Sequence, residues 1–338
     1  MQIQPASLLF DISQARAGHR ERRDASWFWY ANEDNGDTEG ALPFAVDELF
    51  RGQTARHVPM IPSIARGLKT SDLGEMWRAP IADQAQVILR LAQSWWFSKE
   101  LDRHPVAQHA KDQHLDLNPI GLAQHYGIPT GYLDLSDDFD VSAFFATCRE
   151  TDQGWQPADE GTGIIYRVSL RELKEEAFAH YLPLGPQSLP RPTEQGAWVT
   201  ELPMCHAFEG WPGVSMLQFQ HDRRVAEHFL EMFAGGSKLF PPDPLADVAS
   251  EILKCRELPV DLVDAAIQSF AGDPQGPRPD QLQPIRAEIF KHVGPINGRR
   301  LLTEEQVSAL LADEAWCAHR LAVVKARAVA IRRIPVVD

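Results

Sequence analysis

The stretch Leu49-Phe50-Arg51-Gly52-Gln53 decides how the rest of the chain is interpreted. Its apolar pair is typical of a strand anchored in a sheet, and we expect that strand to end at Arg51 and turn at Gly52. Gly52 has no side chain, so a flat ligand group can reach its backbone N–H and C=O directly. The Arg51 guanidinium offers a planar set of donors suited to phosphate or carboxylate. The alternative is a plain strand end with a surface arginine and a turn glycine.

The bulk composition bounds the size and the partners of the protein. A chain of 338 residues is too long for one ordinary domain, and its hydrophobic fraction of 44% is ample for a large core. Asp and Glu number 47 against 33 Lys and Arg, a formal net charge of −14. The overall field therefore opposes binding to nucleic acid or to anionic membranes, although a local basic groove can override it.

Cysteine usage and hydropathy indicate the compartment. The four cysteines are scattered, with no pair at metal-ligand spacing: Cys148, Cys205, Cys255 and Cys317. This pattern favours reduced thiols over a disulfide framework. The first residues lack the profile of a signal peptide, and no apolar run reaches membrane-spanning length. We expect a soluble, cytoplasmic protein without a membrane partner.

The middle of the chain predicts a strand, a polar turn and a helix with an aromatic face. Leu122–Gly127 reads as a short helix that ends at glycine, and Tyr132–Leu135 as the strand that follows. Ser136 is a candidate N-cap for the next helix. The apolar positions of that helix recur at helical spacing, at Val141, Phe144 and Phe145.

A second polar position follows a loop stiffened by prolines. Leu182–Pro192 holds four prolines, and Glu194 and Gln195 come after it, at the start of a predicted strand over Ala197–Thr200. A carboxylate and an amide held by a stiff loop are a favourable arrangement for a positioned polar site. The polar stretch Arg149–Thr162 is predicted to be a surface loop.

The two ends of the chain carry fewer signals. Near the N-terminus we expect the aromatic run Trp27–Tyr30 to pack an arm onto the body, and Asn32–Gly40 to form a loop. An amphipathic helix is predicted over Asp83–Leu101. The histidines that follow are five residues apart, which puts them on different faces of any helix and predicts a solvated segment without a metal site: His104, His109 and His114. Towards the C-terminus, residues 271–284 are a predicted linker, and Thr303–Gln306 is a capping box.

Four stretches in this order resemble the FRG domain, a family named after its Phe-Arg-Gly motif. They are Phe50-Arg51-Gly52-Gln53, Pro62–Arg66, Leu122–Asp134 and Ala143-Phe144-Phe145-Ala146. The run Ala-Gln-His-Tyr-Gly-Ile-Pro-Thr at 123–130 is long and unusual in composition, which makes chance agreement a poor explanation. The resemblance covers roughly residues 44–254.

The same layout is distantly similar to that of ADP-ribosyltransferases, in which an Arg-Gly strand end, a Ser-Thr-Ser strand with a following helix, and a late Glu or Gln-x-Glu loop hold a nicotinamide dinucleotide. The resemblance implies an α+β fold with a split mixed or antiparallel β-sheet flanked by helices. It also implies three parts: an N-terminal arm (1–43), an FRG domain (44–254) and a mainly helical C-terminal extension (255–338).

The function implied by this resemblance is cleavage of NAD at the nicotinamide–ribose bond and transfer of ADP-ribose to a protein, a nucleic acid or water. Arg51 would hold the pyrophosphate or ribose, the Gly52 backbone would pair with the carboxamide, and His125 would orient ribose or acceptor. Tyr126 or Tyr132 would stack on nicotinamide. The alternative for His125 and Tyr126 is a satisfied buried pair under the 118–135 loop. The remaining implied cofactor contacts are Gln53, Arg66, Asp134 and Ser136.

The catalytic positions implied by the resemblance are Glu194 and Gln195, with Glu201 as an alternative. The sequence departs from the pattern where Gly131 replaces an arginine found in many FRG sequences, and where Asp134-Leu135-Ser136 replaces Ser-Thr-Ser. Two alternatives remain open. One is a non-catalytic module that binds a nucleotide or a partner, and the other is nucleic-acid binding through the basic cluster between Arg16 and Arg23.

Overall fold

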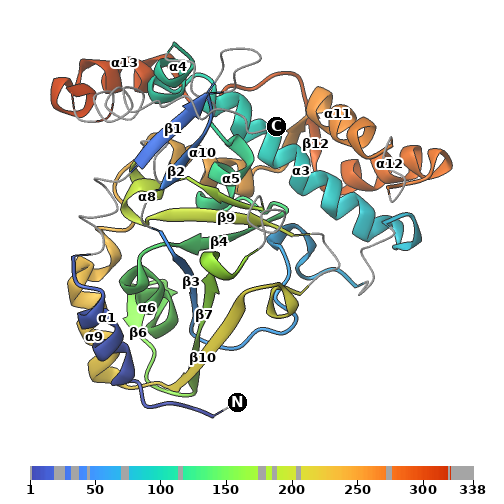
Figure 1. Cartoon of the computed structure of the whole chain (residues 1–338). Helices are drawn as coiled ribbons and strands as arrows, with labels where there is room; N and C mark the ends of the chain where they lie inside the picture. Colours follow the sequence, from blue (N-terminus) through green and yellow to red (C-terminus); the bar gives the residue numbers. More distant parts are fainter. Residues whose placement is uncertain are drawn as a thin grey trace, which may run out of the picture.

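A six-stranded antiparallel β-sheet forms the centre of the molecule in the computed structural model (Figure 1). The structure describes residues 2–18, 27–31, 38–43, 46–69, 76–112, 117–173, 180–184, 189–202, 207–271, 276–318 and 320. The strand order is β10-β7-β3-β4-β9-β8. The bounds are β3 (Glu48–Gln53), β4 (Tyr132–Ser136), β7 (Thr162–Ser169), β8 (Tyr181–Pro183), β9 (Ala197–Glu201) and β10 (Val214–Gln220).

The sheet is continuous on one side of β3 and nearly separated on the other. β3 pairs with β7 along its whole length, from Glu48 to Gln53, but with β4 only at Phe50 and Ser136. Arg51 and Gly52 therefore lie inside the strand, and the expected turn at this point is wrong. The ladder continues because Tyr166, Ile165 and Ile164 of β7, all good strand formers, pair with Arg51, Gly52 and Gln53.

One face of the sheet is covered by α6 (Phe139–Thr147), with α1 (Leu8–Ala15) and α9 (Arg223–Met232) packed behind it (Figure 1). This layer has its own apolar cluster, which includes Phe50, Phe144, Ile165, Phe219 and Phe229. The predicted stripe of α6 is buried at Val141 and Phe144, whereas Phe145 is half-buried. The helix thus packs against β3 and β7 on the side that Phe50 faces.

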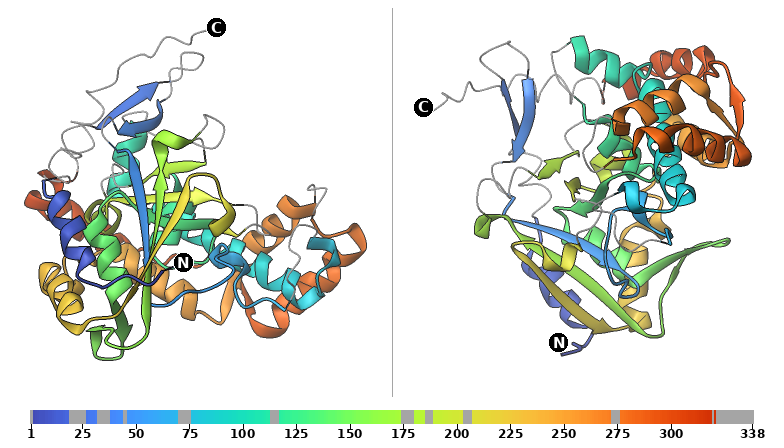
Figure 2. Two further views of the ribbon diagram at one scale, coloured as in Figure 1. Left: turned by 60° about the horizontal axis from the view of Figure 1, so that its bottom comes forward. Right: turned by 90° about the vertical axis from the view of Figure 1, so that its right-hand side faces the viewer.

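The other face packs against a larger helical layer. It contains α3 (Ile81–Leu101), α5 (Pro119–His125) and α10 (Pro244–Lys254), and α11 (Val260–Ala271) and α12 (Leu282–His292) pack on α3. Figure 2 shows α11 and α12 beside α3, on the side of the molecule away from α1 and α9. Buried residues from the sheet and from the C-terminal segment belong to one cluster, which includes Leu133, Ile252, Ile289 and Leu302. The α+β class is confirmed. The described residues after 255 are mainly helical, and the extension with its boundary at residue 255 stays a prediction.

The remaining elements are short. They are β1 (Trp27–Ala31), β2 (Thr38–Pro43), α4 (Pro105–Asp112), β5 (Cys148–Thr151), β6 (Gly154–Pro157), α8 (Pro190–Glu194), β11 (Glu257–Pro259), β12 (Gly294–Ile296) and α13 (Glu304–Ala312). The β5–β6 hairpin replaces the loop expected over Arg149–Thr162, and β2 includes the end of the loop expected over Asn32–Gly40. Both errors arise because strand pairing overrides a polar, glycine-containing sequence.

Two helix starts differ in how well the sequence predicted them. Thr303 and Gln306 form the expected capping box at the start of α13. The N-cap of α6 is Asp138, whose side chain accepts a hydrogen bond from the Asp140 N–H, so the expectation for Ser136 is wrong. The Ser136 hydroxyl instead accepts from the Asp138 N–H at 3.0 Å and donates to the Gln195 carbonyl at 2.6 Å.

One further prediction from the sequence is wrong, and others concern residues that lie outside the described part of the chain. His104 is fully buried, so the expected solvated segment is wrong at this position. His19, Arg20, Arg22, Arg23, His114, Cys205 and residues 272–275 of the predicted linker lie outside the described residues. In the part of the chain that is described, no helix has the length and apolar character needed to cross a membrane.

Candidate functional site

A pocket of about 610 Å³ opens where β3 and β4 separate. Its walls come from β3, α5, β4, α6, the β5–β6 hairpin, α8, the segment before α10, and α10 itself. A volume of about 300–1,000 Å³ is typical of small-molecule sites. The polar residues that line it are Arg51, Gln124, His125, Asp134, Ser136, Ser142, Glu150, Arg191, Gln195 and Ser250.

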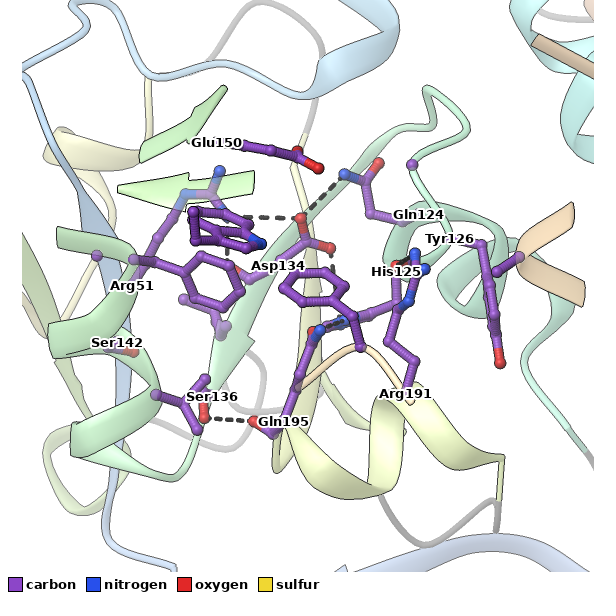
Figure 3. Close-up of a pocket in the computed structure, with 18 of the residues that line it drawn as sticks. Arg51, Gln124, His125, Tyr126, Asp134, Ser136, Ser142, Glu150, Arg191 and Gln195 are labelled. Atoms are coloured by element: carbon purple, nitrogen blue, oxygen red, sulfur yellow. Dashed lines mark hydrogen bonds and ion pairs between the residues drawn. The ribbon is translucent and has the colours of Figure 1, made fainter. Parts of the chain in front are cut away.

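Arg51 bridges the gap between the separating strands (Figure 3). Its Nη1 donates to the Asp134 carbonyl oxygen at 2.6 Å and lies 3.7 Å from Asp134 Oδ2. The side chain is only 13% exposed, and its buried Nε has no hydrogen-bond partner within the described chain. The guanidinium is therefore fixed at the pocket wall by a backbone carbonyl, and part of its donor capacity remains unused.

Asp134 lies at the centre of the polar residues in Figure 3. Its Oδ2 accepts a hydrogen bond from Gln124 Nε2 at 3.1 Å, and its Oδ1 lies 3.6 Å from His125 Nε2. Oδ1 is buried and accepts no hydrogen bond from any described residue. An unsatisfied buried oxygen is costly, and the rest of the Asp134 side chain is one-third exposed to the pocket.

His125 and Gln195 connect the second wall of the pocket to the segment before α10. His125 Nδ1 lies 3.3 Å from Gln195 Oε1, and His125 Nε2 lies 3.2 Å from the Trp198 carbonyl. Gln195 Nε2 donates to the Leu239 carbonyl at 3.0 Å. Both ring nitrogens of His125 thus face acceptor oxygens, and a neutral ring can donate to only one of them.

A second arginine lines the pocket opposite Arg51. The Arg191 guanidinium lies 5.0 Å from the Tyr126 ring and 5.1 Å from the Phe240 ring, and its Nη1 donates to the His125 carbonyl at 3.3 Å. Its Nε is buried and makes no hydrogen bond to the chain as described. Cation–π contacts orient the group without using its in-plane donors, of which Nη1 alone has a described hydrogen bond.

An aromatic wall of Phe145, Trp155 and Phe240 completes the cavity. Trp155 and Phe240 stack with their ring centroids 5.4 Å apart and their planes at 18°. Phe145 meets both rings edge-on, at 5.7 and 6.1 Å. All three rings are half-buried, so part of this apolar surface is open to a planar ligand group.

Gly52 has a structural reason to lack a side chain. A Cβ at this position would lie 1.8 Å from the Ser142 carbonyl oxygen and 2.8 Å from the Ala146 nitrogen, both in the α6 backbone. Gly163 of β7 meets the same helix, with a Cβ position 2.7 Å from the Ala146 carbonyl. The bare backbone of Gly52 therefore lets α6 approach the sheet, in addition to lining the pocket.

A sequence model of the FRG domain family matches residues 47–154. The chain contains an FRG domain. A search of curated proteins and a search of solved structures each found no match. The FRG match includes β3, α5, β4, α6 and β5, whereas Arg191, Gln195, Phe240 and α10 follow it in the chain.

The expected site residues fall into three groups. Those that line the main pocket are Arg51, Gly52, His125, Tyr126, Asp134, Ser136 and Gln195. Gln53 and Arg66 of the FRG domain line a separate pocket of about 380 Å³. Partial burial lowers the pKa of Arg66, and the charge of Arg51 acts in the same direction, so the two arginines lie within electrostatic range. Tyr132, Glu194 and Glu201 are not among the residues lining either pocket.

Tyr126 lines the pocket but is engaged by other parts of the protein. Its hydroxyl donates to Asp243, and its ring contacts Arg191 and Phe97. Burial, together with the nearby Asp243, raises the pKa of Tyr126 well above 10.0, so the hydroxyl stays protonated. Its ring thus supports the wall and Arg191, and the open aromatic surface belongs to Trp155 and Phe240.

Sequence patterns alone did not single out Gln124, Glu150, Arg191, Trp155 or Phe240. Gln124 and Arg191 stand in stretches already recognised as unusual, next to His125 and ahead of Glu194. The spacing of these residues along the chain does not show that the gap between β3 and β4 and the later segments of the chain bring them into one pocket. Among the described residues, no group of three or more His, Cys, Asp and Glu side chains is placed to hold a metal ion.

Proposed function

We propose that the pocket binds NAD and that the chain breaks the nicotinamide–ribose bond, passing ADP-ribose to a macromolecular acceptor or to water. The observation that carries this proposal is the composition of one cavity. Two guanidiniums with unused donors, an open aromatic wall and a carboxylate with an unpaired oxygen line the same 610 Å³. These are the groups that a pyrophosphate, a planar ring and a ribose require.

In this proposal Arg51 and Arg191 hold the pyrophosphate from two sides. The chain carries a net charge of −14, so anion binding depends on local cations such as these. Trp155 and Phe240 offer a surface for the nicotinamide or adenine ring. The polar groups around Asp134 face the ribose, and the order of motifs along the chain, which resembles that of ADP-ribosyltransferases, supports the same assignment.

Cleavage of the nicotinamide–ribose bond requires few protein groups. When the C1′–N bond breaks, its electron pair moves to the nicotinamide nitrogen and leaves a cationic ribosyl group, related to the intermediate of glycoside cleavage. A carboxylate close to C1′ stabilises this cation, and an acceptor hydroxyl or water then forms the new C–O bond and releases its proton. The acceptor, whether protein or nucleic acid, meets the ribose only after this step.

One observation favours a second candidate function, a module that binds a nucleotide without turnover. Both ends of the Gln195 amide are hydrogen-bonded inside the protein, to His125 and to Leu239. Glu194 ends α8 and is not among the pocket-lining residues. The acid–amide pair expected to catalyse therefore offers the pocket no open group, as a non-catalytic relative would.

The test is to titrate the purified chain with NAD by calorimetry and to follow nicotinamide release by chromatography. Arg51→Ala removes charge-assisted hydrogen bonds worth about 1.5–3 kcal/mol, so we expect NAD to bind roughly 10- to 150-fold more weakly. Arg171→Ala is the matched control, because Arg171 is 75% exposed and pairs with Asp47 at the surface. Melting temperatures check that each variant folds.

Three outcomes separate the candidates. Binding with nicotinamide release supports the transferase proposal, and labelled NAD then identifies the acceptor. Binding without release or label transfer supports the non-catalytic module. A wild-type chain that does not bind NAD, or an Arg51→Ala variant that binds it as tightly as Arg171→Ala does, overturns the assignment of this pocket to NAD.

A further inference from the structure

The carboxylates among the described lining residues are Asp134 and Glu150. Glu150 belongs to β5 and is exposed, whereas Asp134 is one-third exposed and lies among Arg51, Gln124 and His125 (Figure 3). Glu194, the acid expected from the sequence, is not at the pocket surface. Of these carboxylates, Asp134 has the position closest to the other polar groups of the cavity.

A hydrogen-bond network of the FRG domain fixes the Gln124 side chain. Gln124 Oε1 accepts from the Ser63 hydroxyl at 2.7 Å, the Thr130 hydroxyl at 2.8 Å and the Thr130 backbone N–H at 3.3 Å. The backbone N–H can only donate, so it determines which end of the amide is the oxygen. Because Gln124 is only 8% exposed, its NH₂ group is committed to Asp134 Oδ2, the contact at 3.1 Å.

The same network decides which oxygen of Asp134 is held by the protein. Gln124 holds Oδ2, and the Arg51 Nη1 lies 3.7 Å from that atom. Oδ1 is buried and accepts no hydrogen bond from the described residues, and its neighbour His125 Nε2, at 3.6 Å, already lies 3.2 Å from the Trp198 carbonyl. Gln124 thus fixes the carboxylate through Oδ2, while the Asp134 side chain as a whole stays one-third exposed at the pocket.

We propose that Asp134 is the catalytic carboxylate of this pocket and that Gln124 is the positioning residue that holds it. This inference rests on the proposed NAD cleavage. The one-third exposed carboxylate faces the ribose as the C1′–N bond breaks and the electron pair of that bond passes to the nicotinamide nitrogen. The carboxylate stabilises the ribosyl cation, and it then accepts the proton that the acceptor hydroxyl or water loses as the C1′–O bond forms.

The experiment compares Asp134→Asn and Gln124→Met with the wild-type chain, measuring NAD affinity by calorimetry and nicotinamide release at saturating NAD. Asn keeps the shape of Asp134 and removes its charge, so we expect release to fall at least about 100-fold, with NAD affinity within about fivefold of the wild type. The matched control is Asp159→Asn, since Asp159 is exposed and 3.9 Å from Arg149 at the surface.

Gln124→Met separates positioning from general packing, because Met has a similar length and cannot donate a hydrogen bond. We expect kcat to fall about tenfold with NAD affinity unchanged. A Gln124→Met variant that changes only the melting temperature contradicts the positioning role.

The remaining outcomes distinguish the inference from the function on which it rests. A wild-type chain that releases no nicotinamide overturns both. If the wild type and Asp134→Asn release nicotinamide equally well, the inference is overturned and the proposed function stands. The same conclusion follows if Glu194→Gln loses activity while Asp134→Asn stays active. Loss of NAD affinity in Asp134→Asn, parallel to the loss of release, makes Asp134 a binding group and contradicts the catalytic role.

Discussion

At the scale of the residue, the three residues of the Phe-Arg-Gly triplet have different roles on the two faces of β3. Successive side chains of a strand point to opposite faces, so Phe50 and Gly52 share one face and Arg51 takes the other. Phe50 packs edge-on against Phe139 at 5.4 Å, and Gly52 admits the α6 backbone. Arg51 reaches across the sheet gap to the Asp134 carbonyl. The close approach of α6 to the sheet and the placement of Arg51 in the pocket therefore depend on adjacent positions of β3.

Gly52→Ala should destabilise the fold by about 2–3 kcal/mol, the usual cost of overpacking. The new methyl would lie 1.8 Å from the Ser142 carbonyl, and backbone atoms cannot move aside as a flexible side chain does. Gly131→Ala is the matched control, because a Cβ there has no neighbour within 4 Å, and it should shift stability by less than about 0.5 kcal/mol. Urea denaturation measures both, and equal midpoints would contradict the role assigned to Gly52.

Sequence patterns predicted part of the pocket lining at this scale. Arg51, His125, Asp134 and Gln195 were expected at the site and line one cavity. Arg191 could not be predicted, because its place depends on where the short helix α8 packs, and no periodicity in the sequence indicates that. The same holds for Phe240, whose ring reaches the pocket from position 240, well beyond the end of the FRG match at residue 154.

At the scale of the element, a long helix with periodic apolar residues could be predicted from the sequence, whereas the pairing of strands could not. The helix expected over Asp83–Leu101 is α3, which starts two residues earlier. Local signals failed where a neighbouring strand decides the structure, as for Gly52 inside β3 and for the β5–β6 hairpin. Glycine and polar residues indicate turns only when no partner strand supplies hydrogen bonds.

The corner between α3 and α4 carries a buried histidine that makes stability depend on pH. Burial lowers the pKa of His104 from 6.5 to about 4, against a smaller opposing effect of Asp243. Its Nδ1 accepts from the Val106 N–H, and its ring meets Trp316 edge-on at 5.8 Å, so the neutral ring joins α4 to the C-terminal segment. Protonation of this ring is favoured in the unfolded chain and opposed in the folded one.

Since the unfolded chain binds this proton first, stability falls as pH decreases from 6.5 towards 4, where the folded ring also titrates. The loss attributable to His104 should total about 3 kcal/mol. His104→Gln should flatten this part of the stability–pH curve measured by chemical denaturation. His292→Gln, at a 72% exposed histidine, should keep the wild-type slope. Equal slopes in all three proteins would contradict this account.

At the scale of the whole molecule, the C-terminal helices share a core with the sheet layer. Ile285 and Ile289 of α12 are buried against α3, and the Leu302 backbone N–H donates to Glu100 Oε2 at 2.8 Å. The sequence placed a linker before this segment but could not show that it folds back, because proline and glycine indicate only a break in regular structure.

This shared core predicts that residues 46–302 unfold as one unit. Ile289→Ala, at a side chain that is 1% exposed, should cost about 2–5 kcal/mol and lower the temperature of the whole transition. Leu311→Ala, at a side chain that is 54% exposed, should cost less than about 0.5 kcal/mol. Calorimetry tests this through agreement of the calorimetric and van't Hoff enthalpies. Two separate transitions would show that the C-terminal segment is an independent domain.

The cavity walls come from both sides of residue 154, where the FRG match ends. The matched stretch supplies Arg51 and Asp134, and the later stretch supplies Arg191 and most of the aromatic surface. A lineage that keeps the first stretch and replaces the second would retain Arg51 and Asp134 while exchanging Arg191 and most of the aromatic wall. Two proteins with the same FRG motifs can therefore differ in the molecule they accept, and the residues to compare between them lie beyond the motif that names the family.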